Sequence, residues 1–181
     1  MRVVSVNAGQ SRVVDWKGRK VRTAIFKTPI AGAVAVHELG LEVDQQANRS
    51  VHGGPRQAVY AYPSEHYEFW QPQLGLDLDW GAFGENLTVQ GLLEEAVHVG
   101  DQFRVGSVLF QVTKPRVPCY KLTVKFARDD IFELFRVSRR WGFYLAVLEA
   151  GEISAGDAVL AVHHDTREPT LADLVSQRLK A

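Results

Sequence analysis

The chain contains a single cysteine, Cys119, and the residues around it favour a reactive thiol. It lies in the stretch "KPRVPCYKL", residues 114–122, after prolines that hold the backbone extended and prevent an earlier helix start. We therefore expect a helix to begin at about Cys119, where the helix dipole and the cations Arg116 and Lys121 favour the thiolate. A thiolate is a nucleophile and a ligand for soft metals, and the alternative is a buried, inert cysteine.

A second candidate site is the segment "VHGGPRQ", residues 51–57. The paired glycines Gly53 and Gly54 allow positive φ angles and leave backbone N–H groups uncovered, as an anion-binding nest requires. His52 and Arg56 place a titratable and a permanent cation beside that pair. The segment is not a P-loop, because it lacks the Gly-Lys-Ser/Thr ending, and a plain turn between strands is the alternative.

The third candidate is "FGENLTV", in which Glu85 and Asn86 follow a glycine and open a predicted strand. A carboxylate at such a position can accept two hydrogen bonds from the amino-amidine edge of a pterin or guanine. An Asx-type turn is the alternative.

Two adjacent histidines near the C-terminal end, His163 and His164, are followed by Asp165. Adjacent residues in a strand point to opposite faces, so the pair is poorly placed to chelate one ion. No Cys-x-x-Cys or His-rich spacing supports a structural zinc site. The sequence therefore argues against a metal site there.

Charge is balanced overall but segregated along the chain. The 21 basic and 21 acidic residues give a formal net charge of zero, which argues against a dedicated nucleic-acid-binding protein. If two basic blocks converge, they form a positive pocket for an anionic ligand, and the alternative is two solvated faces. The blocks are Arg12, Lys17, Arg19, Lys20, Arg22 and Lys27, and then Lys114, Arg116, Lys121, Lys125 and Arg128.

The composition indicates an ordinary soluble globular domain. The chain has 181 residues, of which 46% are hydrophobic and 23% charged. No run approaches the roughly 20 apolar residues that span a membrane, and the N-terminus lacks the features of a signal peptide. With one cysteine as well, we expect a cytoplasmic protein without a membrane partner.

Short β-branched or alternating runs predict a mainly β protein with a few helices, built as an antiparallel barrel or closed sandwich. The predicted strands are 2–7, 20–26, 32–37, 57–62, 86–89, 101–105, 107–113, 143–150 and 158–164. The predicted helices are 63–74, 119–126, 129–138 and 169–180.

The last helix carries a capping box, with Thr170 at the cap and Asp173 standing in for Glu. A polar connector, residues 163–169, precedes it. We expect a barrel domain at residues 1–165 and a short helical appendage at 166–181. The aromatic residues of 60–70 are predicted to be core, because no Lys or Arg interleaves with them.

Taken in order, several segments resemble a MOSC domain, the module named for the C-terminus of molybdenum cofactor sulfurase. They are "AIFKTPIAGAVAV", "VHGGPRQAVYAYPSEHYEFW", "FGENLTVQGL", "VHVGDQFRVGSVLFQVTKPRVPCYKL" and "GFYLAVLEAGEISAGDAV". The resemblance covers about residues 1–162 and is strongest to the small stand-alone bacterial branch that includes reducers of N-hydroxylated compounds.

The resemblance implies a β-barrel with a cleft for a molybdenum-pterin cofactor. It matches Cys119 to a cysteine that ligates molybdenum or carries a persulfide. Pyridoxal phosphate binding is a further family-level expectation. The positions matched to the surroundings of the cofactor or its phosphate are Lys27, His52, Gly53, Gly54, Arg56, Glu85, Asn86 and Arg116.

The function implied is reduction of N-hydroxylated bases or related N-oxygenated small molecules. No Gly-x-Gly-x-x-Gly fingerprint for a flavin or nicotinamide follows a strand, so the expected partner is an external flavoprotein electron donor. The alternatives are a sulfur carrier with a persulfide on Cys119 and a non-catalytic pterin- or anion-binding module. A monomer and a homodimer are both open.

Two departures from the family pattern bear on these expectations. Where the family often reads Gly-Asp-Arg-Gln-Ala-Asp, this chain reads "VDQQAN", with Gln45 in place of the arginine and Asn48 in place of a carboxylate. Loss of that arginine would weaken binding of a cofactor phosphate. The tail after the domain is also shorter than the three-helix tail of related reductases.

Overall fold

The computed structural model describes residues 1–47 and 53–180. Its strands are β1 (Arg2–Ala8), β2 (Arg12–Trp16), β3 (Arg19–Thr23), β4 (Thr28–Pro29), β5 (Val34–His37), β6 (Gly40–Leu41), β7 (Val59–Pro63), β8 (Leu87–Gln90), β9 (Gln102–Val105), β10 (Val108–Pro115), β11 (Phe143–Glu149), β12 (Gly151–Ile153) and β13 (Val159–His163). Its helices are η1 (Pro55–Gln57), α2 (Glu65–Leu74), α3 (Lys121–Phe126), α4 (Ile131–Ser138) and α5 (Leu171–Lys180).

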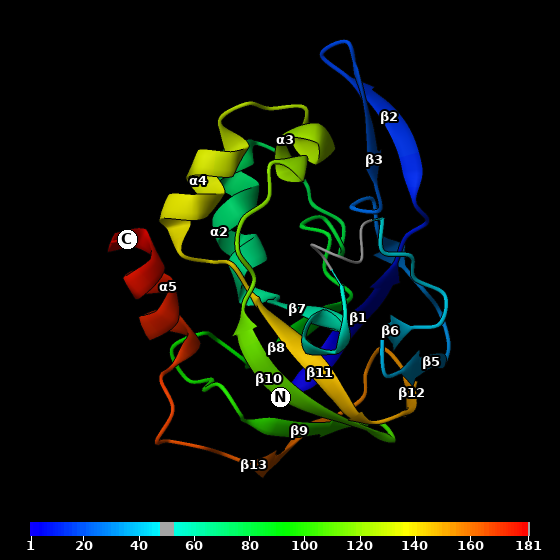
Figure 1. Cartoon of the computed structure of the whole chain (residues 1–181), viewed down its shortest axis with the longest axis vertical. Coiled ribbons are helices and arrows are strands. Elements are labelled where there is room, and N and C mark those ends of the chain that lie inside the picture. Colours follow the sequence, from blue (N-terminus) through cyan, green and yellow to red (C-terminus); the bar gives the residue numbers. More distant parts are fainter. Residues whose placement is uncertain (48–52, 181) are drawn as a thin grey trace.

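The main sheet has eight strands in the order β13-β9-β10-β11-β7-β8-β1-β4 (Figure 1). Every neighbouring pair in it is antiparallel except β7 and β8, which are parallel. This arrangement confirms a mainly β fold with a few helices. The β1 and β13 ends of this sheet meet through a bridge between Arg2 and Ala158 and through backbone hydrogen bonds such as that from the Val159 N–H to the Met1 carbonyl at 3.0 Å. The strand order has no β1–β13 ladder among the described residues, so the sheet is not the closed barrel that we expected.

Two smaller sheets complete the architecture. One has the order β12-β5-β6, and the other is the hairpin β2-β3. In Figure 1 this hairpin projects from the body of the molecule, on the side opposite α4 and α5. The hairpin carries several cations of the first basic block and leads at its end into the segment that lines the site described below.

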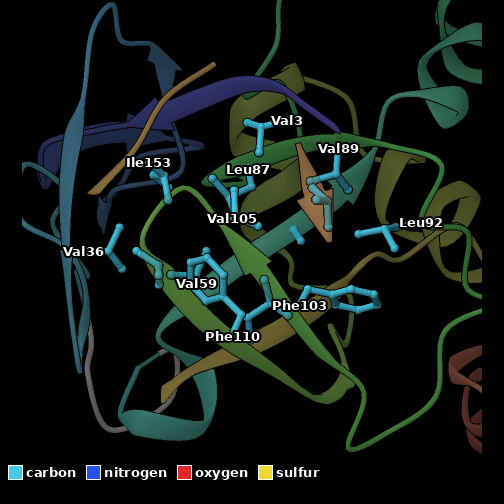
Figure 2. Packing of buried hydrophobic residues seen from close by; sticks show 14 of the residues in the cluster. Val3, Val36, Val59, Leu87, Val89, Leu92, Phe103, Val105, Phe110 and Ile153 are labelled. Carbon is cyan, nitrogen blue, oxygen red and sulfur yellow. The ribbon is translucent and has the colours of Figure 1, made fainter. Parts of the chain in front are cut away.

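A core rich in valine lies against one face of the main sheet. Figure 2 shows side chains from many strands meeting there, among them Val59, Val105 and Phe110. The alternation predicted for 107–113 is visible in β10, where Val108, Phe110 and Val112 are all buried in this cluster. Burial of these apolar side chains supplies the main driving force for the fold.

A second core is aromatic and lies between the sheet and helices α2 and α4. Strand β7 is buried along its whole length because its alternation divides it between the two cores. Val59 and Ala61 belong to the valine-rich core, whereas Tyr60 and Tyr62 belong to the aromatic one. The prediction that the aromatic residues of 60–70 are core is therefore confirmed.

The helices are short and end where their sequences indicate. Helix α2 continues past Pro72 and stops at Gly75, which adopts the left-handed conformation. The capping box of α5 is confirmed, because Thr170 Oγ1 accepts from the Asp173 N–H at 3.0 Å and donates to its carboxylate at 2.8 Å. No helix of the described residues is long and apolar enough to span a membrane.

Helix α5 is packed into the body of the protein. Leu171 is fully buried in the valine-rich core, and Val175 is fully buried in the aromatic core. The helix therefore shares both cores with the sheet.

Candidate functional site

A cavity of about 100 Å³ brings together segments that are far apart in the sequence. Its walls come from the chain after β3, the chain after β6, the start of β7, the loop before β8 and the segment between β10 and α3. Cations from both basic blocks therefore meet at one site. Its polar and charged lining includes Lys27, Asp44, Asn86, Arg116, Cys119 and Lys121.

Cys119 is half-buried at this cavity, two residues before α3. We expected a helix to begin at about Cys119, and it begins two residues later, with Tyr120 as the N-cap and Lys121 as the first helical residue. The Cys119 carbonyl oxygen accepts a bond of 3.0 Å from the Leu122 N–H, so the residue still belongs to the turn that leads into the helix. The cations Arg116 and Lys121 line the same cavity as the sulfur-bearing residue.

Arg116 is a buried cation in the wall of the same cavity. The residue is 6% exposed, and its guanidinium carbon lies 5.3 Å from the Tyr60 ring centroid and 5.6 Å from that of Phe135. Its Nη1 is buried and has no hydrogen-bond partner among the described residues. An unsatisfied buried donor costs about 1–3 kcal/mol, and an anion bound at the cavity can relieve that cost.

Lys27 belongs to a buried polar network rather than acting as an isolated cation. Its Nζ lies 2.5 Å from the carboxylate of Asp44, and both side chains are less than a tenth exposed. Burial lowers the pKa of Lys27, although the neighbouring Asp44 carboxylate acts in the opposite direction. Asn86 donates to Asp44 at 2.9 Å and accepts from the Tyr60 N–H at 3.2 Å, so the network fixes this wall of the cavity.

Sequence reasoning missed Asp44, which is the centre of that network. Its carboxylate also accepts a bond of 2.9 Å from the Gly9 N–H, and so it joins the end of β1 to the cavity. The neighbouring Gln45 lines the cavity and accepts a 2.9 Å bond from the Ser11 N–H. The signal was available, since Asp44 directly precedes Gln45 in the stretch compared with the family pattern.

Glu85 does not present its carboxylate to the cavity, in contrast to our expectation for a pterin-binding group. The residue is fully buried and is absent from the cavity lining. Its oxygens accept bonds from the Tyr67 hydroxyl, the Gly81 N–H at 2.9 Å, the Phe83 N–H at 3.1 Å and the Thr88 hydroxyl at 3.0 Å. Glu85 thus holds the loop before β8 in shape from the inside.

The glycine pair lies at the start of η1. Gly54 has a φ of 89°, as the sequence predicted for a nest, and no atom lies within 4 Å of the position that a Cβ would take. Gly53 and Gly54 are half-buried and Arg56 is exposed, and none of the three lines the cavity. His52 and Asn48 lie outside the described residues.

The cavity residues fit a molybdenum-pterin group in their chemistry. A cysteine sulfur suits a soft metal, and Arg116 with its unpartnered Nη1 suits a phosphate. Lys121 adds a second cation to the lining. Gln45, which is neutral, occupies the position that carries an arginine in the family pattern. Arg116 and Lys121 therefore supply positive charge to the cavity in its place.

The fold and this site define a known class of domain. The MOSC domain family matches residues 48–160, and the chain belongs to that family. The resemblance inferred from the sequence is thereby confirmed.

Individual relatives agree with that assignment. The chain is 44% identical over 154 residues to YflK of Bacillus subtilis, which covers 85% of this chain and 70% of YflK. It is 43% identical over 136 residues to YiiM of Escherichia coli, which covers 74% of this chain and 61% of YiiM. A protein of Gibberella moniliformis named "Reductase" is 35% identical over 147 residues, or 78% of this chain and 26% of that protein.

Solved structures share the fold. The crystal structure of YiiM from Geobacillus stearothermophilus has a TM-score of 0.82 at 33% identity, covering 98% of this chain and 83% of that one. The crystal structure of YiiM from Escherichia coli has a TM-score of 0.74 at 30% identity, covering 97% of this chain and 76% of that one.

Proposed function

We propose that this protein is a molybdenum-pterin-dependent reductase of N-hydroxylated bases or related N-oxygenated small molecules, supplied with electrons by a separate flavoprotein. Membership of the MOSC family and the relative named "Reductase" support an oxidoreductase. The observation that carries the proposal is the meeting of the Cys119 thiol and the buried Arg116 guanidinium at one cavity.

Each group at the cavity has a role that follows from its chemistry. Cys119 would hold the metal, while Arg116 and Lys121 would hold the phosphate of the pterin. When bound, the cofactor would supply the electron transfer that removes the substrate oxygen as water. The protein binds and orients these groups.

Reduction of an N–OH group to N–H consumes protons as well as electrons, and the cavity wall holds a group suited to supply them. Lys27 lines the cavity, and its ammonium group forms a salt bridge with the Asp44 carboxylate. Because burial lowers the pKa of Lys27, its ammonium releases a proton more readily than an exposed lysine does. The pair would therefore serve as a proton donor at the cavity.

The test is to purify the protein from a host that makes the molybdenum cofactor and to measure molybdenum and pterin per chain. Reduction of an N-hydroxylated base is then assayed with a chemical electron donor. We expect the wild type to contain both components and to be active. Cys119→Ser should lose activity because a serine hydroxyl is a poor ligand for a soft metal.

Arg116→Gln should retain less pterin than the wild type, because it removes the buried cation. Arg104→Gln is the matched control, since Arg104 is on β9 and pairs with Glu149 away from the cavity. Equal cofactor content in the two arginine variants would contradict the assigned phosphate site.

A sulfur carrier is the second candidate, and the half-exposed position of Cys119 among cations favours it. A persulfide on Cys119 would be stabilised as its anion by those cations. Sulfur released by cyanide from a protein without molybdenum would identify this function. A bound phosphate compound with neither signal would identify a binding module.

A further inference from the structure

A second cluster of metal-binding side chains lies at the β9–β13 edge of the main sheet. Asp101 directly precedes β9, His98 lies in the turn before it, and His164 directly follows β13. The two strands pair antiparallel with His163 opposite Gln102, which brings these residues together. In Figure 1 this edge and α3, which follows Cys119, lie at opposite ends of the molecule.

The three side chains are close to the geometry of a metal site. His164 Nδ1 lies 3.0 Å from Asp101 Oδ1, and His98 Nδ1 lies 3.9 Å from Asp101 Oδ2. One ligand atom from each of the three residues lies within 4.8 Å of the others. Ligand atoms bound to a tetrahedral zinc ion at about 2.0 Å are roughly 3.3 Å apart. The three side chains would therefore need to move only slightly closer together to bind an ion. His164 has room for that movement, because its side chain is 51% exposed.

His98 supplies the observation that points to a ligand. Its side chain is 16% exposed, and its Nδ1 is buried without a hydrogen-bond partner among the described residues. A buried polar atom in this state is costly, whereas coordination of a metal ion would satisfy it.

Asp101 is already held in place for such a role. The residue is 1% exposed, and it accepts bonds of 2.9 Å from the backbone N–H groups of His98 and Asp165. Contacts of this kind orient a carboxylate that binds a metal and reduce the cost of ordering it.

We propose that His98, Asp101 and His164 bind a divalent transition-metal ion of the zinc class. Two imidazoles and one carboxylate suit zinc and cobalt, and a set of three protein ligands leaves a position for water. The proposal is independent of the function assigned to the Cys119 cavity.

The site would have a structural consequence for the C-terminal end. His98 forms a bridge with Thr170, and the Leu171 N–H donates to the Val97 carbonyl at 2.9 Å. A metal bound by His98 and His164 would therefore fasten both ends of the polar connector, residues 163–169, to the sheet edge. Metal binding should then stabilise the docking of α5.

The experiment uses the 181-residue chain after removal of metals by a chelator. Zinc binding is measured by calorimetry, and cobalt binding by its visible absorption, which is sensitive to coordination geometry. We expect one ion per chain and a melting temperature that rises with zinc concentration. His164→Ala should weaken binding by at least about 10-fold.

The matched control is His163→Ala, because His163 is adjacent in sequence and similarly exposed, at 49%. It should bind zinc as the wild type does. His164→Gln is a second variant, which can keep a hydrogen bond to Asp101 but lacks the imidazole, and it should also bind weakly.

Cys119 is the competing metal ligand in this chain, so the titration is repeated with Cys119→Ser. Retained binding in that variant supports the proposal. The proposal is overturned by loss of binding in Cys119→Ser, by equal affinities of His164→Ala and His163→Ala, or by absence of binding to the wild type.

Discussion

Replacing Glu85 by glutamine tests the role that the structure gives this residue. All the groups that contact its carboxylate are hydrogen-bond donors, namely the Tyr67 and Thr88 hydroxyls and the Gly81 and Phe83 N–H groups. A glutamine amide has one acceptor oxygen and one donor NH₂ group. In its best orientation the NH₂ group would face the Phe83 N–H and leave it without an acceptor.

The magnitude follows from that count. One buried donor left unsatisfied costs about 1–3 kcal/mol, so Glu85→Gln should lower the free energy of unfolding by this amount. Urea denaturation followed by tryptophan fluorescence measures the loss. Glu95→Gln, at an exposed position, is the control and should be close to neutral. A Glu85→Gln protein as stable as the wild type would refute the structural role.

The pH dependence of stability provides a second test of Glu85→Gln. Burial raises the pKa of Glu85, although the surrounding donors act to lower it. A raised pKa in the folded state contributes stability below the unfolded value of about 4.3, and that stability is lost as pH rises through the folded pKa. Glutamine does not titrate, so the stability difference between wild type and variant should narrow as pH rises. A difference that widens would mean that the hydrogen bonds outweigh burial.

Four further substitutions have defined outcomes in the same denaturation assay. Gly142→Ala should cost more than about 1 kcal/mol, because its φ is +66° and the new Cβ would lie 2.5 Å from a carbonyl oxygen. Gly156→Ala, with a φ of +93° and no atom within 4 Å, isolates the cost of the positive φ without a steric clash and should cost less. Thr170→Ala should cost about 1 kcal/mol through loss of the α5 cap. Lys27→Met should cost about 3–5 kcal/mol, because the Asp44 carboxylate would remain buried without its cation. A smaller loss would show that the other hydrogen bonds to Asp44 are enough to stabilise its charge.

The sequence predicted most of the strands that take part in the cores. Each predicted run, from 2–7 to 158–164, overlaps an observed strand, because alternation of apolar side chains reports burial on one face. It missed β4, β6 and β12, which have only two or three residues and too few side chains to show a period. It also missed β2, whose five side chains are mostly exposed and show no buried face. Closure was over-predicted, because strand pattern reveals which residues are buried but not whether the last strands pair.

The sequence predicted which cations lie near the thiol at the candidate site, but it did not predict the positions of the carboxylates. Lys27, Arg116 and Cys119 share the cavity, as the segregated charge suggested. Whether Asp44 and Glu85 contribute to the site depends on where their side chains point, and the sequence alone does not determine that direction in a loop. Asp44 turned out to contact the cavity, whereas Glu85 turned out to be inside the loop.

Neighbouring positions in the Gly-Glu-Asn stretch connect the loop to the cavity. Glu85 binds inward to the loop backbone, whereas Asn86, next in the chain, faces the cavity and donates to Asp44 at 2.9 Å. Asp44 in turn holds Lys27. A change at Glu85 should therefore reach the cavity indirectly, by displacing Asn86, even though its carboxylate touches no ligand. Weakened cofactor binding in Glu85→Gln would then accompany lost stability, because the carboxylate acts on the cavity only through the loop that carries Asn86.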